Sequence, residues 1–165
     1  LEALKLISKW LKVAFDDPEN INARGGMLIG SCFAGVAFMK GLGLVHSISH
    51  MIGAEYNTQH GLTNAIILPP VMRFNLPHVG EKVRFISDAM DLKEASSDLV
   101  VKEIEQILDY VDIPKSLSEI GIPLECKKRI AEKAMLDSAT GTNPRAAQIE
   151  DVEKLTEISI LSARA

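Results

Sequence analysis

The sequence predicts an all-α fold, a helical bundle-like arrangement that we expect to form one domain over residues 1–165. Apolar residues recur at helical spacing along nearly the whole chain, and no alternating stretch is long enough for a useful strand. Small residues are frequent between Ala23 and Lys40, which lets a helix there approach its neighbours closely. A chain of 165 residues is long enough to bury a sizeable core.

The first helix is expected over Leu1–Phe15, where the leucines and isoleucine repeat on one face. It starts without an N-cap residue or an initiator Met, so we expect the chain to be part of a longer protein. The letters DDPEN end this helix, and Asn20 or Asn22 can cap the next one, over Ala23–Lys40. The remaining helices are expected at Leu44–Tyr56, Gly61–Asn75, Gly80–Met90, Ser97–Val111, Leu124–Ser138 and Ile149–Ala163.

Charge and composition exclude several classes of partner. The formal net charge is −4, with signs scattered along the chain, so no basic stripe is present to neutralise nucleic-acid phosphates. We expect no membrane contact, because no apolar run approaches the ~20 residues of a membrane span and no signal-like start is present. Cys32 and Cys126 lie far apart without zinc-type spacing, which indicates reduced thiols in a cytoplasmic protein.

Three of the four histidines lie within fifteen positions of an otherwise apolar stretch. His46 and His50 are four residues apart, so on a helix they point to nearly the same side, about 40° apart around the axis. His60 follows after Gly53 and the Asn57-Thr58 pair, where the chain can turn and bring His60 close to His46. Imidazole is a natural ligand for iron, zinc and related ions. The spacing favours His46 and His60 as metal ligands.

A structural interpretation of the same histidines stays open, because any helix can carry two histidines on one side as hydrogen-bonded core groups. Two protein ligands are also too few for a catalytic metal, which takes three or four. No Asp, Glu or Cys within the stretch is well placed to complete the set, so other ligands would have to come from elsewhere. His78 follows a proline in a polar connection and is expected on the surface. Residues 80–165 are expected to supply core and scaffold only.

The segment Gly41–Gly43, with the letters GLG, is not a dinucleotide-binding fingerprint. His46 stands where the third glycine of G-x-G-x-x-G would be, and no strand precedes the segment. The phosphate loop G-x-x-x-x-G-K-[ST] is also absent from the sequence. We therefore assign no cofactor-binding residue to this chain.

The stretch GVAFMKGLGLVHSISHMIGAEYNTQHGLTNAIILPPVMRFN resembles the signature region of the iron-containing (group III) alcohol dehydrogenases. That family reads G-L-G-x-x-H-x-x-x-H-x-x-G-A and then, ten positions after the second histidine, H-G-x-x-N-A-x-x-L-P. The letters ATGTNPR, from Ala139 to Arg145, also look like that family. The resemblance covers essentially the whole chain, as the C-terminal, all-helical domain.

The resemblance implies an N-terminal α/β domain, absent from this chain, that binds NAD or NADP. It implies a divalent ion, Fe²⁺ or Zn²⁺, held by one Asp and three His in the cleft between the domains. His46 and His60 match two of these ligands, and the other two would precede Leu1. His50 matches a position lining the substrate pocket, where it is either a proton relay or a pocket wall. Asn64 is expected to hydrogen-bond a ligand imidazole.

The implied reaction is reversible hydride transfer between a small alcohol and its aldehyde or ketone, in a protein whose relatives are commonly homo-oligomers. Glycerol dehydrogenation or maleylacetate reduction, known in the same superfamily, is an alternative. A helical interaction module with structural histidines is a second, non-enzymatic one. Three departures from the family pattern, Met51, Gln59 and Pro70, touch no ligand but affect the shape of the pocket and hence the choice of substrate.

Overall fold

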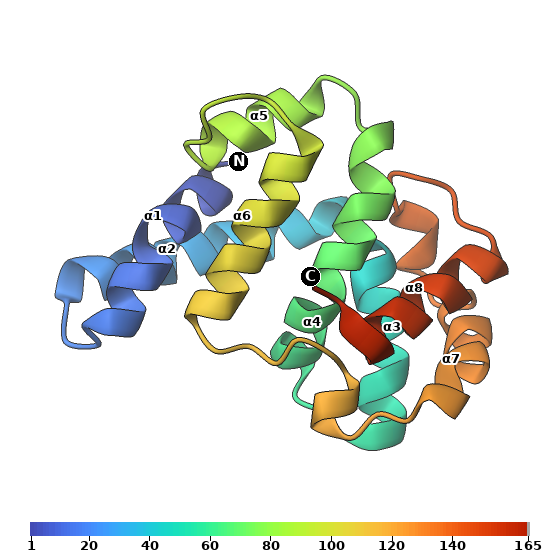
Figure 1. Cartoon of the computed structure of the whole chain (residues 1–165). Helices are drawn as coiled ribbons and strands as arrows, with labels where there is room; N and C mark the ends of the chain where they lie inside the picture. The colour runs from blue at the N-terminus through green and yellow to red at the C-terminus, as the bar shows by residue number, and fades with distance from the viewer. Residues whose placement is uncertain (165) are drawn as a thin grey trace. The chain divides into compact units, whose positions relative to one another are not determined.

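The computed structural model describes residues 1–164, and within this range every regular element is a helix (Figure 1). Eight α-helices and five short 3-10 helices there confirm the predicted all-α fold. The chain divides into two compact units. The first unit combines Leu1–Lys40 with Val79–Val111, and the second combines Gly41–His78 with the chain from Asp112 onward.

The α-helices are α1 (Glu2–Asp16), α2 (Ile21–Ala37), α3 (Gly43–Tyr56), α4 (His60–Asn75), α5 (Lys82–Ala89), α6 (Ser97–Tyr110), α7 (Lys127–Ala134) and α8 (Ile149–Ser162). The 3-10 helices are η1 (Phe38–Lys40), η2 (Leu76–His78), η3 (Ser118–Ile120), η4 (Leu124–Cys126) and η5 (Thr140–Thr142).

The expected helices correspond to these elements, with one marked difference at 124–138. That stretch begins as η4, continues as α7 and stops being α-helical at Ala134. The Thr140 hydroxyl donates a hydrogen bond of 2.6 Å to the Ala134 carbonyl oxygen, which otherwise would accept from the next turn of helix. A side chain six residues further along the sequence thus helps to end the helix, and its effect is not visible in the apolar periodicity.

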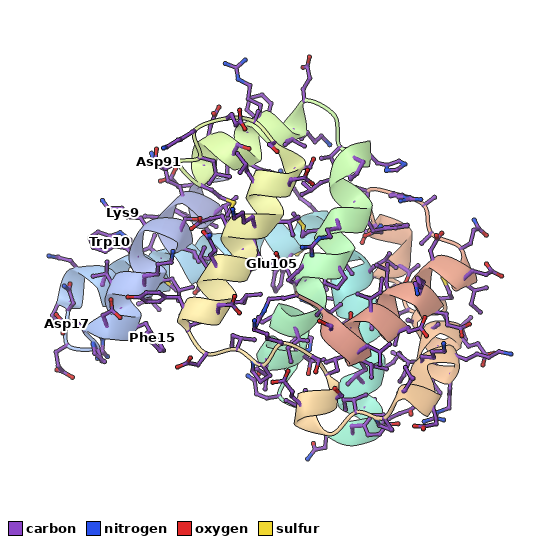
Figure 2. All side chains as sticks on the ribbon, viewed as in Figure 1. Lys9, Trp10, Phe15, Asp17, Asp91 and Glu105 are labelled. Carbon is purple, nitrogen blue, oxygen red and sulfur yellow. The ribbon has the colours of Figure 1, made fainter. Side chains whose placement is uncertain are left out.

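In the first unit, α1 packs closely against α2. Gly26 and Gly30 are fully covered by α1: a Cβ on Gly26 would lie 2.6 Å from Trp10 Cγ, and one on Gly30 would lie 3.1 Å from Ile7 Cγ1. Figure 2 labels Trp10 on α1. The Asn20 side chain accepts a hydrogen bond of 3.0 Å from Ala23 N, so the expected cap of α2 is present. Small residues therefore permit the close approach that the sequence predicts.

The opposite side of α2 is apolar but exposed, with Leu28 and Val36 74% and 67% exposed, and Met39 of the following η1 is 90% exposed. Ile21–Lys40 is the single segment within residues 1–164 whose length and hydropathy suffice to cross a membrane. This corrects our expectation that no run approaches that length, because aliphatic and aromatic residues between the small ones keep the mean hydropathy at 1.2. One such helix is weak evidence for a membrane span, since the core helix of a soluble protein has the same character.

In the second unit, α3 and α4 pack against each other and against α7 and α8 (Figure 1). The fully buried aliphatic side chains of this core include Leu44, Ile48, Ile52, Ile66, Ile67, Ile130 and Ile160. Burying each contributes roughly 1.5–3 kcal/mol, which fixes α3 and α4 as neighbours. Both cysteines are free, Cys126 in this core and Cys32 exposed on α2, as expected for reduced thiols.

Candidate functional site

Helix α3 carries two of the histidines, His46 and His50, beside the side of the helix that is buried. Leu44, Ile48 and Ile52 are fully buried in the core of the second unit. His46 and His50 lie between these positions in sequence and are only partly buried. The helix therefore presents both imidazoles together at the edge of the core.

His60 is the first residue of α4 and reaches the same place through a short turn. Asn57 ends α3 in the left-handed conformation, with φ 54° and ψ 39°, as asparagine tolerates well. The Gln59 side chain then caps α4 by accepting from Leu62 N. The predicted turn at Asn57-Thr58 is thus present, and it reverses the chain within three residues.

The structure brings His46, His50 and His60 into one cluster. The ring centroids of His46 and His60 are 5.3 Å apart, those of His50 and His60 are 5.5 Å apart, and those of His46 and His50 are 5.8 Å apart. The rings of His50 and His60 are stacked, with 16° between their planes. His78, in contrast, lies in η2, is exposed, and is not part of the cluster.

One amide group joins the rings of His46 and His60. Asn64 Nδ2 lies 2.9 Å from His60 Nε2 and 3.3 Å from His46 Nε2. An amide nitrogen only donates, so both Nε2 atoms accept and each neutral ring carries its proton on Nδ1. The expected contact of Asn64 with His60 is present, and the lone pairs of two Nε2 atoms converge on one point.

Burial lowers the pKa of His46 below its usual value, and the nearby rings of His60 and His50 lower it further. A backbone hydrogen bond at Leu42 and the carboxylate of Asp137 act in the opposite direction but are weaker. His46 is therefore neutral at neutral pH, which is the protonation state a metal ligand requires.

The third ring is held by an acid that the sequence analysis missed. His50 Nδ1 lies 2.8 Å from Asp137 Oδ2. Burial raises the pKa of Asp137, but hydrogen bonds from the Ala139 N–H and from His50 outweigh it, so the pKa lies below the usual value. The ionised carboxylate can only accept, so His50 donates from Nδ1, and in the Nδ1–H tautomer of a neutral ring Nε2 is the acceptor.

The expectation that residues 80–165 supply only scaffold is therefore wrong at Asp137. Its partner His50 is 87 residues away in sequence, and neither spacing nor periodicity links the two. The one signal that could have found it is its position two residues before the ATGTNPR stretch.

His46 and His60 present two Nε2 atoms that converge on the Asn64 amide. Among residues 1–164, no group of three or more His, Cys, Asp or Glu side chains is arranged to hold a metal ion. The third imidazole is instead bound to Asp137. The chain thus supplies two donors of a kind that iron and zinc accept, together with a neighbouring oriented imidazole.

A cavity of about 320 Å³ adjoins this cluster in the second unit. His46 lines it, together with mostly apolar side chains of α4, among them Leu68, Val71 and Met72. The start of α3 and the loop residues Thr142 and Asn143 form its remaining walls.

Sequence and structure comparisons give a consistent result. The profile of the "Fe-containing alcohol dehydrogenase family, C-terminal" matches residues 1–160. The chain is 40% identical over 136 residues to a lactaldehyde reductase of Escherichia coli, covering 78% of this chain and 36% of that protein. It is 35% identical over 167 residues to an NAD-dependent methanol dehydrogenase of Bacillus methanolicus, covering 94% and 42%.

The solved structure of an alcohol dehydrogenase from Oenococcus oeni superposes with a TM-score of 0.90 at 31% identity. That match covers 96% of this chain and 43% of the other. The chain thus spans about two fifths of the length of the relatives it matches.

Proposed function

Because the chain belongs to the Fe-containing alcohol dehydrogenase family, as its C-terminal part, we propose that it forms the metal-binding half of an NAD(P)-dependent alcohol dehydrogenase. The reaction is the interconversion of a small alcohol with its aldehyde or ketone by hydride transfer. The observation that carries the proposal is the convergence of His46 Nε2 and His60 Nε2 on the single amide of Asn64.

His46 and His60 are the proposed metal ligands of this chain, for Fe²⁺ or alternatively Zn²⁺. A bound ion of this kind supplies Lewis-acid chemistry at the substrate oxygen. We assign the remaining ligands, an Asp and a His by the family resemblance, to polypeptide that precedes Leu1 in the complete protein. This assignment agrees with the two donors present here, because a catalytic site takes three or four.

His50 is the proposed catalytic residue. Asp137 fixes its tautomer, so that Nε2 can accept a proton or a hydrogen bond from a substrate hydroxyl. The stacking of its ring on His60 places this acceptor next to a proposed metal ligand. Asp137 acts through His50 and is a positioning residue.

The nicotinamide cofactor, NAD or NADP, is assigned to an N-terminal nucleotide-binding domain of the complete protein. Two observations support this: the sequence contains no phosphate-binding fingerprint, and the relatives are more than twice as long as the matched segment. The cytoplasmic location rests on the family and on the two free cysteines, and the homo-oligomer on the family alone.

The experiment is metal analysis of the complete protein with His46→Ala, His60→Ala and, as a matched control, His78→Ala. We expect each of the first two to lose most of its bound iron or zinc, because a ligand is removed. The control removes an exposed histidine outside the cluster and should retain the metal. Unchanged metal content in both ligand variants would refute the proposal.

Turnover separates the remaining alternatives. A panel of simple alcohols, glycerol and maleylacetate with both nicotinamides should give its highest kcat/KM for a simple alcohol. Activity on glycerol or maleylacetate alone would favour the other superfamily reactions. A His50→Ala variant that stays folded should be inactive, whereas lower stability with unchanged turnover would indicate that the histidine is only structural.

A further inference from the structure

The GLG segment, Gly41–Gly43, leads into α3 and leaves room for side chains that bind the start of this helix. Leu42, the residue before α3, makes no side-chain cap, so the first turn of the helix has no cap from its own sequence. Thr142, the last residue of η5, and Asn143 after it lie about 100 residues later and supply the missing hydrogen-bond acceptors. We call this pair of side chains the α3 cap.

Thr142 uses every hydrogen-bonding position of its hydroxyl. Its Oγ1 accepts from Leu42 N at 3.1 Å and from Gly43 N at 3.2 Å. The same hydroxyl donates to the Ala139 carbonyl oxygen at 2.7 Å. Since a hydroxyl has one donor and two lone pairs, this donation directs both lone pairs at the start of α3.

Asn143 joins α3 to the far end of α4. Its Oδ1 accepts from Leu44 N at 3.2 Å and from Asn75 Nδ2 at 3.0 Å. Its Nδ2 donates to Asn75 Oδ1 and to the Arg145 carbonyl oxygen, both at 2.7 Å. Asn75 is the last residue of α4 and is nearly buried. One side chain therefore binds the first turn of α3 and the last turn of α4.

Arg145 reinforces the contact with α4. Its Nη1 donates to the Phe74 carbonyl oxygen at 3.3 Å, and its guanidinium carbon lies 3.7 Å from the centroid of the Phe74 ring. This cation–π contact and the hydrogen bond both act at the last turn of α4.

The two glycines of the GLG segment make room for the α3 cap. Gly41 and Gly43 have φ values of 113° and 68°, in the left-handed region that side chains disfavour. A Cβ on Gly41 would lie 2.6 Å from Thr142 Oγ1, and one on Gly43 would lie 2.9 Å from Asn143 Oδ1. Any other residue at either place would push the cap away from the backbone.

We propose that Thr142 and Asn143 are positioning residues for the metal site, acting through the helices that carry His46 and His60. His46 follows Gly43 by three residues and lies in the turn that the cap holds. Without these acceptors the first turn of α3 has unpaired N–H groups and frays, so the backbone that positions His46 Nε2 beside His60 becomes less ordered. The inference rests on the proposed function of these histidines.

The test uses the complete protein, titrated with Co²⁺ and followed by its visible absorption. Thr142→Val keeps the shape of the side chain but removes the acceptor, while Thr142→Ser keeps the acceptor. We expect Thr142→Val to weaken Co²⁺ binding by about tenfold to a hundredfold and to alter the spectrum. Thr142→Ser should restore both. Asn143→Asp, which retains Oδ1 but loses both donated bonds, is the second variant and should weaken binding as well.

The matched control is Asn20→Ala, which removes the cap of α2 in the other unit. It should lower thermal stability like the Thr142→Val variant while leaving Co²⁺ affinity and spectrum unchanged. If both variants, Thr142→Val and Asn143→Asp, bind Co²⁺ as the unsubstituted protein does, the positioning role of the cap is wrong, while the proposed function is unaffected. Absence of Co²⁺ binding in the unsubstituted protein would instead overturn the proposed function.

Discussion

At Glu55, near the end of α3, two cations meet one carboxylate. Arg129 Nη2 lies 2.8 Å from Glu55 Oε2, and Lys133 Nζ lies 2.6 Å from Glu55 Oε1, both from α7. Hydrogen bonds from Arg129 and then Lys133 lower the pKa of Glu55 to about 2. The carboxylate is mostly covered while both cations are about half exposed. This ion triad joins a helix of the histidine cluster to α7.

The triad predicts a pH dependence of stability. The pKa of Glu55 is lower in the folded state, so its contribution is fully present above the unfolded value of about 4.5 and is lost as the pH falls toward 2. Glu55→Gln should therefore lower the free energy of unfolding at pH 7 by about 1 kcal/mol, a value limited by solvent screening of the cations. Urea unfolding at pH 7 and pH 3 should show the difference shrinking at the lower pH.

The matched control is Glu132→Gln. Glu132 is exposed on α7, the helix that also carries Arg129 and Lys133, and it forms no ion pair within residues 1–164. It should leave the unfolding midpoint unchanged at both values of pH. A difference for Glu55→Gln that stays constant between pH 7 and pH 3 would contradict the linkage.

The sequence predicted the histidines and their nearby partner Asn64, but not the partners that are distant in sequence. His46, His50 and His60 lie on one short stretch, so helical geometry and a turn were enough to bring them together. Asp137, Thr142 and Asn143 act across 87 to 100 residues. Such contacts depend on how α3 packs against the C-terminal helices, and local periodicity carries no information on that packing.

At the scale of single elements, adjacent glycines of α2 face opposite surroundings. Gly26 is buried against the Trp10 ring of α1, whereas a Cβ on Gly25 would meet no atom within 4 Å. Gly26 is thus required by packing, while Gly25 contributes only the flexibility of a glycine within a helix.

This contrast predicts opposite effects of the same substitution. Gly25→Ala should stabilise the protein by about 0.5–1 kcal/mol, because alanine restricts the unfolded chain and favours the helix. Gly26→Ala should destabilise it by about 1–3 kcal/mol, because the new methyl group overlaps Trp10. Thermal unfolding of the pair, measured side by side, checks both; effects of the same sign would mean that α1 and α2 pack differently.

Helix positions were predictable to within a few residues because apolar periodicity and capping residues are local signals. Asn20 is one such cap, and its role could be read directly from the sequence. The failure at 124–138 has a physical cause, since the Thr140 hydroxyl binds the Ala134 carbonyl and ends α7 early. Contacts of this kind form only after the following loop has folded back.

At the scale of the whole molecule, the exposed apolar face of α2 requires an explanation. Its most exposed large side chains include Ile21, Leu28 and Val36. Exposed large apolar side chains on one side of a helix are typical of an interaction surface. We expect the proposed N-terminal domain to cover this face.

Cys32 lies on this face and provides a probe of it. N-ethylmaleimide should alkylate Cys32 readily in the chain of residues 1–165, and about tenfold more slowly or less in the complete protein. The buried Cys126 is the internal control, because it stays unmodified only while the second unit is folded. Equal rates for Cys32 in both forms would show that the N-terminal part does not cover α2.

The distance in sequence between α3 and its cap also has a consequence for biosynthesis. Leu42 leaves the ribosome 100 residues before Thr142, and the whole later part of the first unit is made in between. At about 5–20 residues per second, the start of α3 waits on the order of 5–20 s for its acceptors. The imidazoles are therefore synthesised before the side chains that complete the cap of their helix.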